Sequence, residues 1–496
     1  MKQALISALL LLTAHNAVAV NKETEALSDY AVTHYQQSQI HTLANMVSFP
    51  TVNQKGISTL ENPHFIGFKT LLKMKAAELG LTYEDHGHTV LISLGTQKDK
   101  VTIVTHGDVQ PADPTKWQKS PFKMDMTSEP GKMIGRGTED DKGAIATALY
   151  AMKAIKDNTI ALNNRIELMI YLAEESNWAP LREFMKTYQQ PKYAVTIDAS
   201  YPVVVAEKGW GLIAPTFSAP TNTDNVYLSQ LKGGAFVSQI PEDASVRIHN
   251  LSEQQLAKIK QAKAQLKNVT VTLKQEANAT LITVKGESAH SSEPEAGVNA
   301  IAYLAELLKN IPLDNNSDGQ AIKFINQLIG LNLYGEHFGE IAYKHDFMGP
   351  MTVSPTLISR QDNAITLSVN IRRPVGKEKS SLSQQIEQAI ANWQQQNQVT
   401  ILDKKVTIGE PMLLDSAPHA AALLSIFKHY TGDESASYVS IGGGTNAKLF
   451  DNAVSFGPSM PGKKYTGHSE HEFLTVEQIE LNLRMYTAMI MQLGNM

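Results

Sequence analysis

Short apolar segments alternate with helix-like segments through the first two hundred residues, and this alternation restricts the fold more than any other feature. The short segments are rich in β-branched residues and too short for helices, so they are predicted strands; they are residues 90–94, 101–104, 166–172 and 193–197. Residues 23–48, 62–79 and the Ala-rich residues 142–155 are predicted helices. Strands that alternate with helices predict an α/β fold with a mostly parallel sheet covered by helices.

The pattern changes near residue 213 and changes back near residue 411. Between these points, amphipathic strand pairs are combined with helices, as in the helix 252–266 followed by the strands 269–273 and 279–285. This mixture is typical of an α+β unit. We therefore predict a main domain of residues 20–213 and 411–496, into which a lid domain of residues 214–410 is inserted.

The first nineteen residues have the pattern of a signal peptide. Lys2 precedes an apolar run, and Ala17-Val18-Ala19 forms a small-x-small cleavage site. The run is too short for a stable membrane span, and no cysteine follows it for a lipid anchor. We expect a signal peptide over residues 1–19 and a periplasmic protein without a stable membrane anchor. Secretion and a buried N-terminal helix are the alternatives.

Charge and cysteine content exclude several classes of function. The 44 Lys and Arg residues face 49 Asp and Glu residues, which gives a net charge of −5. A chain without a basic excess is not expected to bind nucleic acid. The sequence contains no cysteine, so disulfides, thiolate metal sites and a cysteine nucleophile are all absent. Any metal ion must be bound by histidines and carboxylates.

Three of the predicted strands run directly into residues that can bind a metal ion. They are His106 and Asp108 after the second strand, Glu174 and Glu175 after the third, and Asp198 after the fourth. Taken singly, these patterns also suit a surface ion pair, a solvated charge pair and a helix cap. In open α/β sheets, however, the carboxyl ends of the strands build the functional site, so their coincidence predicts one.

A glycine-bracketed acidic segment precedes the predicted helix 142–155. Residues 135–143 read GRGTEDDKG, and such a segment can bring carboxylates to the mouth of the sheet. The alternative is an acidic helix N-terminus stabilised by the helix dipole. The residues alone do not distinguish the two.

In chain order, the candidate residues are His106-x-Asp108, the GRGTEDDKG segment, Glu174-Glu175, Asp198 and His468. Together they resemble the pattern of a family of di-zinc metallopeptidases. The family includes aminoacylases, glutamate carboxypeptidases and carnosinase-like dipeptidases. The resemblance extends from about residue 40 to the C-terminus, and the dipeptidase branch fits best. Its blocks here are THGDVQPADPTKWQKSPF, EESNW, IDASYPVVVAEKG, GESAHSSEPEAGVNA, VNIRRPVG, IGGGTNAKLF and GHSEHEF.

The resemblance implies two divalent metal ions held in the main domain. Asp140 would bridge both ions, with His106 and Asp198 on one ion and Glu175 and His468 on the other. The ligand set suits zinc best, and cobalt or manganese would also be accepted. His471 is an alternative to His468, which is preferred for its place in the block.

Further roles also come from the resemblance. Glu174 would be the general base, Asp108 would orient His106, and the peptide bond between Asp140 and Asp141 would be cis. In the lid, His290 would stabilise the oxyanion and Arg372 would bind the carboxylate of the substrate. A backbone cradle near that carboxylate would comprise Gly442, Gly443, Gly444 and Thr445.

The implied activity is metal-dependent hydrolysis of dipeptides. The long lid resembles that of monomeric dipeptidases, so we expect a monomer that acts on small peptides. Ala173 replaces the family's usual Asp, and Ser238-Gln239-Ile240-Pro241 replaces Asn-x-Val-Pro, which leaves the specificity open. An N-acyl amino acid deacylase or a carboxypeptidase with the same site is the alternative. The complete ligand set argues against an inactive relative that only binds peptides.

Overall fold

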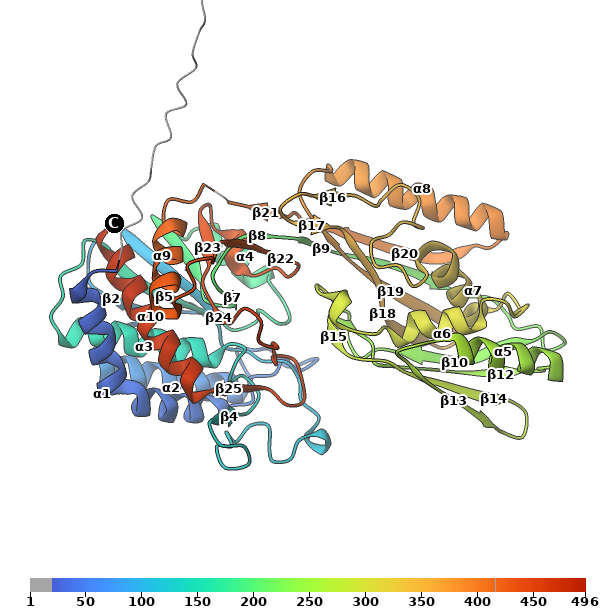
Figure 1. The fold of residues 1–496 in the computed structure, drawn as a ribbon, viewed down its shortest axis with the longest axis horizontal. Coiled ribbons are helices and arrows are strands. Elements are labelled where there is room, and N and C mark those ends of the chain that lie inside the picture. Colours follow the sequence, from blue (N-terminus) through green and yellow to red (C-terminus); the bar gives the residue numbers. More distant parts are fainter. Residues whose placement is uncertain (1–19, 415) are drawn as a thin grey trace, which may run out of the picture. The chain divides into compact units, whose positions relative to one another are not determined.

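The computed structural model describes residues 20–414 and 416–496, and the chain divides into two compact units, which are described separately (Figure 1). The expected signal peptide, residues 1–19, lies outside the described residues. The first unit contains the described residues up to Val205, together with Leu414–Val439 and Thr445–Met496. The second contains Ala206–Leu413 and Ser440–Gly444.

The first unit is built on a mixed sheet with a parallel centre. Along the sheet, the strands follow the order β1 (Thr82–Asp85), β2 (Thr89–Leu94), β5 (Arg165–Tyr171), β3 (Lys100–His106), β6 (Tyr193–Thr196) and β23 (Ala453–Ser455). The strand β3 is parallel to both β5 and β6, and β23 is parallel to β6, whereas β1 and β2 pair antiparallel at the edge. The predicted α/β fold with a mostly parallel sheet is confirmed.

Helices pack on this sheet through one hydrophobic core. The helices α1 (Lys22–Val47), α3 (Lys142–Asp157) and α10 (Val476–Asn495) contact one another and lie side by side in Figure 1. The Ala-rich helix α3 is buried along nearly its whole length, because small side chains let its neighbours approach closely. The helices α2 (Pro63–Leu79), α4 (Ala179–Met185) and α9 (Ala420–Thr431) complete the unit.

The second unit contains an eight-stranded antiparallel sheet. Its order is β13 (Thr270–Gln275), β14 (Thr280–Lys285), β12 (Asp243–His249), β10 (Tyr227–Gly233), β18 (Thr352–Gln361), β19 (Ala364–Arg373), β9 (Gly209–Phe217) and β20 (Ile401–Ile408). Alternate residues of β12 are buried, which is typical of an antiparallel sheet with one covered face. The covering helices are α5 (Glu253–Gln265), α6 (Ala300–Leu308), α7 (Ser317–Phe324) and α8 (Lys379–Asn397). The predicted α+β lid is confirmed.

The topology of this sheet is repeated. If β9, β18, β19 and β20 are numbered 1 to 4, they lie in the order 2-3-1-4. If β12, β13, β14 and β10 are likewise numbered 1 to 4, they also lie in the order 2-3-1-4. In the chain, however, β10 precedes the other three strands. The two halves meet where β10 pairs with β18, with Gly233 opposite Ile358. The repeat concerns strand order and is not visible in the sequence.

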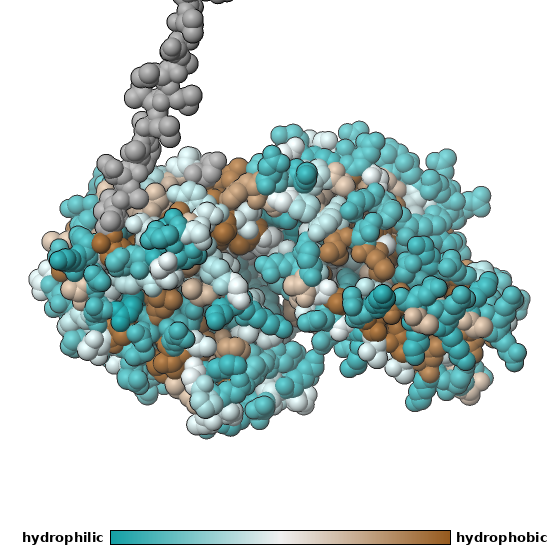
Figure 2. Space-filling model, viewed as in Figure 1, coloured by the Kyte–Doolittle hydropathy of each residue, from teal (hydrophilic) through white to brown (hydrophobic). Residues whose placement is uncertain are grey.

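The face of each unit that is visible in Figure 2 is mainly hydrophilic. Figure 2 shows hydrophilic residues over most of the visible face of each unit, with separate hydrophobic patches between them. Among residues 20–414 and 416–496, no helix combines the length and the hydropathy needed to cross a bilayer.

The buried His419 predicts a loss of stability in acid. Burial lowers the pKa of His419 from its usual 6.5 to about 4, although its Nε2 lies 3.0 Å from the carbonyl oxygen of Ala194. The unfolded chain therefore binds a proton that the folded chain does not, so stability falls as the pH drops from about 6.5 to about 4. Between pH 7 and pH 5, this histidine alone should cost about 2 kcal/mol.

The His419→Gln variant tests this expectation, because glutamine can still donate to the carbonyl of Ala194 but does not titrate. Urea unfolding at pH 7 and pH 5 should show a smaller pH-dependent loss in the variant than in the wild type. Equal losses in the two proteins would contradict the assignment.

Candidate metal centre

The parallel strands bring the predicted ligands to one edge of the sheet. His106 is the last residue of β3 and lies opposite Tyr171 of β5, and the chain continues from β5 to Glu174 and Glu175. The strand β6 also runs parallel to β3 and is followed by Asp198. Because the carboxyl ends of these strands coincide, side chains that are far apart in the sequence meet here.

Two groups of side chains can each hold a metal ion, and they share one carboxylate. His106, Asp140 and Asp198 form the first group, and Asp140, Glu175 and His468 form the second. The Nε2 atom of His106 lies 2.8 Å from Oδ1 of Asp140 and 3.6 Å from Oδ1 of Asp198. The Nε2 atom of His468 lies 3.0 Å from Oδ2 of Asp140 and 2.8 Å from Oε1 of Glu175. The two oxygens of Asp140 therefore serve different groups.

The charges of the two groups fit divalent cations. The pKa of Asp198 is raised to about 6, mainly by burial and also by neighbouring Asp140 and Glu175, while His106 opposes the shift. Buried carboxylates this close together are stabilised when a cation neutralises them. Imidazole nitrogens and carboxylate oxygens without thiolates are also a donor set that zinc accepts. The residues present therefore fit a pair of metal ions.

Asp108 was expected to orient His106, and its side chain has a different main role in the structure. Nδ1 of His106 lies 3.0 Å from the main-chain carbonyl oxygen of Asp108, whereas the nearest carboxylate oxygen of Asp108 is 3.6 Å away. That carboxylate accepts hydrogen bonds from the backbone N–H groups of Glu174, at 2.9 Å, and Glu175, at 3.0 Å. Asp108 thus holds His106 mainly through its backbone and holds the two glutamates through its side chain.

Glu174 lies beside the ligand groups but belongs to neither. Its backbone is held on both sides, since its N–H donates to Asp108 and its carbonyl accepts a hydrogen bond from the indole N–H of Trp178 at 2.8 Å. Burial raises the pKa of Glu174 well above its usual value, and the nearby carboxylate of Asp198 raises it further. The backbone of Glu174 is therefore held next to the ligands, and without bound cations its carboxyl group is biased toward holding a proton.

The loops that carry Asp140 and His468 have unusual backbones. The peptide bond between Asp140 and Asp141 is cis, as the resemblance implies. His468 has φ 63°, a left-handed conformation that is uncommon for residues other than glycine. A left-handed conformation of this kind persists where the surrounding structure holds it, and such residues cluster at functional sites. This conformation accompanies the approach of the His468 imidazole to Asp140 and Glu175.

Two contacts to the ligands had little or no signal in the sequence. The hydroxyl of Tyr465 donates to Oδ2 of Asp140, and the amide of Gln110 donates to Oε2 of Glu175 at 2.8 Å. Gln110 lies four residues after His106, so only its closeness to that histidine pointed to it. Tyr465 lies in a polar loop without any marking pattern.

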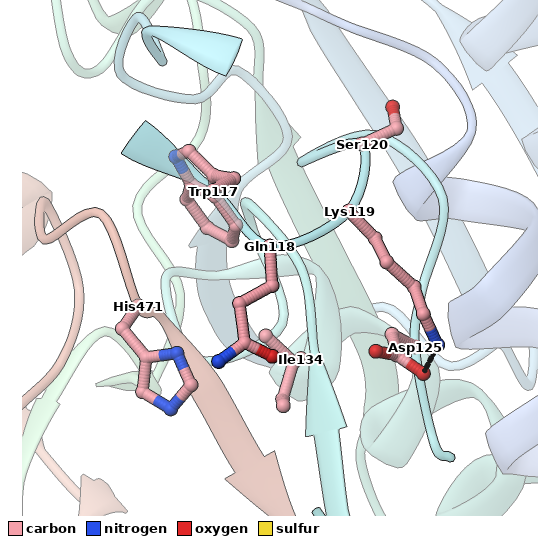
Figure 3. A pocket seen from close by; sticks show the side chains of 7 residues that line it. All are labelled: Trp117, Gln118, Lys119, Ser120, Asp125, Ile134 and His471. Carbon is pink, nitrogen blue, oxygen red and sulfur yellow. Dashed lines mark hydrogen bonds and ion pairs between the residues drawn. The ribbon is translucent and has the colours of Figure 1, made fainter. Parts of the chain in front are cut away.

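The alternative ligand, His471, lies elsewhere. Its Nε2 atom is 2.8 Å from a carboxylate oxygen of Glu129, and it belongs to neither ligand group. Figure 3 shows it in a small pocket, where Lys119 points toward Asp125 and forms an ion pair of 2.7 Å. The pocket is lined by Trp117, Gln118, Lys119, Ser120, Asp125, Ile134 and His471. The structure therefore brings His468, and not His471, to the ligands.

Within the second unit, Arg372 is a buried cation without an acidic partner. Its guanidinium donates to the hydroxyl of Ser291 at 2.9 Å, the side-chain oxygen of Asn370 at 3.1 Å and the carbonyl of Gly442 at 3.4 Å. The residue is 4% exposed, and burial lowers its pKa to about 9. No carboxylate pairs with it among the residues that the structure describes. A buried charge of this kind favours an anionic ligand.

Two of the other residues predicted to bind the substrate lie near Arg372: Gly442 contacts it directly, and His290 precedes its partner Ser291 in the chain. Nδ1 of His290 is 2.5 Å from the hydroxyl of Ser292, next to Ser291. A Cβ atom at Gly442 would lie 2.2 Å from the carbonyl oxygen of Ser292, so only glycine fits there, whereas Gly443 meets no such restriction. Gly443 and Gly444 belong to the second unit. The hydroxyl of Thr445 accepts the N–H of Ala447 and begins a short helical turn, Asn446–Leu449.

The strand ends of an α/β sheet assemble two ligand groups around one carboxylate, and an antiparallel lid is inserted into the chain. These features define a metallohydrolase with two adjacent metal ions. Residues 102–492 match the model of peptidase family M20/M25/M40. The chain therefore belongs to this family and is a metallopeptidase of the hydrolase class.

Individual relatives agree with this membership. A protein of Staphylococcus aureus (strain bovine RF122 / ET3-1) with the name "Putative dipeptidase" is 27% identical over 465 residues, which cover 90% of this chain and 95% of that protein. Human carnosine dipeptidase 1 has a similar fold, with a TM-score of 0.59 and 14% identity over 96% of this chain and 99% of that one. The di-peptidase Dug1p from Saccharomyces cerevisiae follows, with a TM-score of 0.57 and 12% identity over 95% and 98% of the two chains.

Proposed function

We propose that the protein hydrolyses dipeptides with two divalent metal ions, one bound by His106, Asp140 and Asp198 and the other by Asp140, Glu175 and His468. The observation that carries the proposal is the shared carboxylate of Asp140, whose two oxygens belong to different ligand groups. Zinc suits these ligands, and cobalt or manganese would also be accepted. When bound, such a pair of ions polarises a carbonyl group and lowers the pKa of a water molecule.

Glu174 acts as the general base in this proposal. Its carboxyl group lies outside both ligand groups, and two bound cations would favour its charged form, which can take a proton from the attacking water. The same carboxyl group then donates that proton to the amine that leaves. The backbone N–H of Glu174 donates to Asp108, and its carbonyl accepts a hydrogen bond from Trp178. These bonds hold the backbone from which the side chain extends.

Arg372 binds the C-terminal carboxylate of the substrate. The support is its burial without an acidic partner, because a guanidinium in that state gains most from a carboxylate. His290, close to Ser292 and Ser291, serves to stabilise the oxyanion. The requirement for a free carboxylate would distinguish this enzyme from an aminopeptidase that acts on long chains.

A substrate panel with paired arginine variants tests the proposal. The mature protein, loaded with zinc, cobalt or manganese, is given a dipeptide, its C-terminal amide, a tripeptide and an N-acetyl amino acid. We expect the dipeptide to be the best substrate. Arg372→Met should lower kcat/KM for the dipeptide by about 10- to 100-fold, the value of one charged hydrogen bond, and should leave the poor activity on the amide unchanged.

The control is Arg373→Met, because the neighbouring arginine is also buried but already pairs with Glu410 at 2.9 Å. This variant should keep the preference for the dipeptide over its amide. Turnover of the N-acetyl amino acid alone would replace the dipeptidase assignment with deacylation. Two bound metal ions without turnover of any of the four compounds would contradict both assignments.

A further inference from the structure

Two glutamates that bind no metal link the segment of Asp140 to the segment of His468. The segments approach as a short antiparallel pair, in which β4 (Lys132–Ile134) lies against β25 (Phe473–Thr475). Asp140 follows β4 in the chain, and His468 precedes β25. The ladder ends before either ligand is reached, so other contacts must set the distance between the two side chains.

Glu472 holds the backbone that leads to Asp140. Its Oε1 atom accepts three hydrogen bonds from backbone N–H groups, from Gly137 at 2.9 Å and from Glu139 and Asp140 at 3.0 Å each. Its Oε2 atom accepts a hydrogen bond from the guanidinium of Arg136 at 2.7 Å. The side chain is fully buried. Three backbone donors and one guanidinium on the same buried carboxylate hold this part of the backbone in place.

Glu139 makes the reciprocal contact to the backbone before His468. Its Oε2 atom accepts hydrogen bonds from the N–H of Thr466 at 2.7 Å and the N–H of Gly467 at 3.2 Å, and the hydroxyl of Thr466 donates to the same oxygen. Each segment thus supplies a carboxylate to the backbone of the other. Asp140 follows Glu139 directly, and His468 follows Gly467 directly, so both contacts act next to a ligand.

We propose that Glu139 and Glu472 are positioning residues that hold Asp140 and His468 at the separation needed by the second ion. Neither glutamate belongs to a ligand group. The proposal rests on the proposed function only in that it assumes two bound ions. The first ion shares Asp140 but takes its other two ligands, His106 and Asp198, from strand ends, so it should depend less on these contacts.

Glu167 provides a matched control, because it is a buried carboxylate of the same unit with comparable partners. It accepts hydrogen bonds from Lys100 at 3.1 Å and from the hydroxyl of Tyr188, and Arg165 lies 3.2 Å away. It is 3% exposed, and its hydrogen bonds go to residues of β3 and β5 and to Tyr188, away from the segments of Asp140 and His468. A change from glutamate to glutamine therefore removes a similar buried charge at both positions, but only Glu472 accepts a hydrogen bond from the backbone of a proposed ligand, Asp140.

The experiment titrates the metal-free full chain with Zn²⁺ in competition with a chromogenic chelator, and follows the thermal unfolding of the same metal-free proteins. In Glu472→Gln, one ion per chain should bind about 10- to 100-fold more weakly, the usual cost of losing a residue that supports a ligand. Activity should return when the zinc concentration is raised, with little change in KM. In Glu167→Gln, unfolding should occur at a lower temperature while both metal affinities stay within about twofold of the wild type.

Glu139→Ala serves as the second variant, since Glu139 is partly exposed and water can satisfy the N–H groups that it leaves. It decides the question if Glu472→Gln does not fold. The proposal is overturned if the variants of both glutamates bind both ions as tightly as the wild type, or lose no more affinity than Glu167→Gln. A wild-type chain that binds two ions without cleaving dipeptides would refute the proposed function and leave this result valid.

Discussion

Replacement of Glu174 by glutamine is expected to lower kcat for dipeptide hydrolysis by about 10²- to 10⁴-fold with both metal ions still bound. Glutamine has nearly the same shape, but its amide cannot take a proton from the attacking water. Glu174 lies outside both ligand groups, and its main-chain bond to Asp108 does not involve the side chain that changes. The loss should therefore appear in kcat, while KM and the metal content stay close to their wild-type values.

Steady-state kinetics together with the measured metal content per chain check this result. Glu175→Gln is the matched comparison, because the neighbouring carboxylate lies 2.8 Å from His468 and belongs to the second ligand group. We expect that variant to bind metal more weakly and to recover some activity at high metal concentration. A Glu174→Gln enzyme with two ions and a kcat within about threefold of the wild type would exclude Glu174 as the general base.

The fold of the first unit was predictable because its signals are local. The apolar runs 90–94, 101–104 and 166–172 became β2, β3 and β5 to within two residues at each end. Their length and β-branched content are properties of a few neighbouring residues. The strand order was not readable in this way. In the second unit β9 pairs with β20, nearly two hundred residues later in the chain, and no short pattern encodes such a pairing.

Some residues of the candidate site could be predicted from the strand ends, and others only from the resemblance to a known family. His106, Glu175 and Asp198 follow from the rule that functional residues lie at the carboxyl ends of parallel strands. Asp140 and His468 lie in loops, and the resemblance to a known family was needed to connect them with the other three. The contacts of Glu472 and Tyr465 with the Asp140 segment depend on how two distant loops pack, so they became visible only in three dimensions.

The second large effect concerns Asp140, the only described residue that belongs to both ligand groups. Asn in its place keeps the shape of the side chain but removes the negative charge between the two imidazoles, 2.8 Å and 3.0 Å away. Both ions lose a ligand, so their affinities should fall by more than the roughly 10- to 100-fold that the loss of a supporting residue costs.

The expected loss in kcat for Asp140→Asn is at least about 10³-fold, since metal ions supply several kcal/mol of transition-state stabilisation and about 4 kcal/mol corresponds to that factor. Asp141→Asn is the control, because Asp141 is the next residue, is also buried, and belongs to neither ligand group. Its Oδ2 accepts a hydrogen bond from the hydroxyl of Thr105, which asparagine can also accept.

Metal content and steady-state kinetics distinguish the two variants. Asp141→Asn should bind two ions and keep activity near that of the wild type, whereas Asp140→Asn should do neither. Two tightly bound ions in Asp140→Asn would show that the shared carboxylate does not bridge the metal ions, and the proposed centre would then have to be rebuilt from the other four ligands.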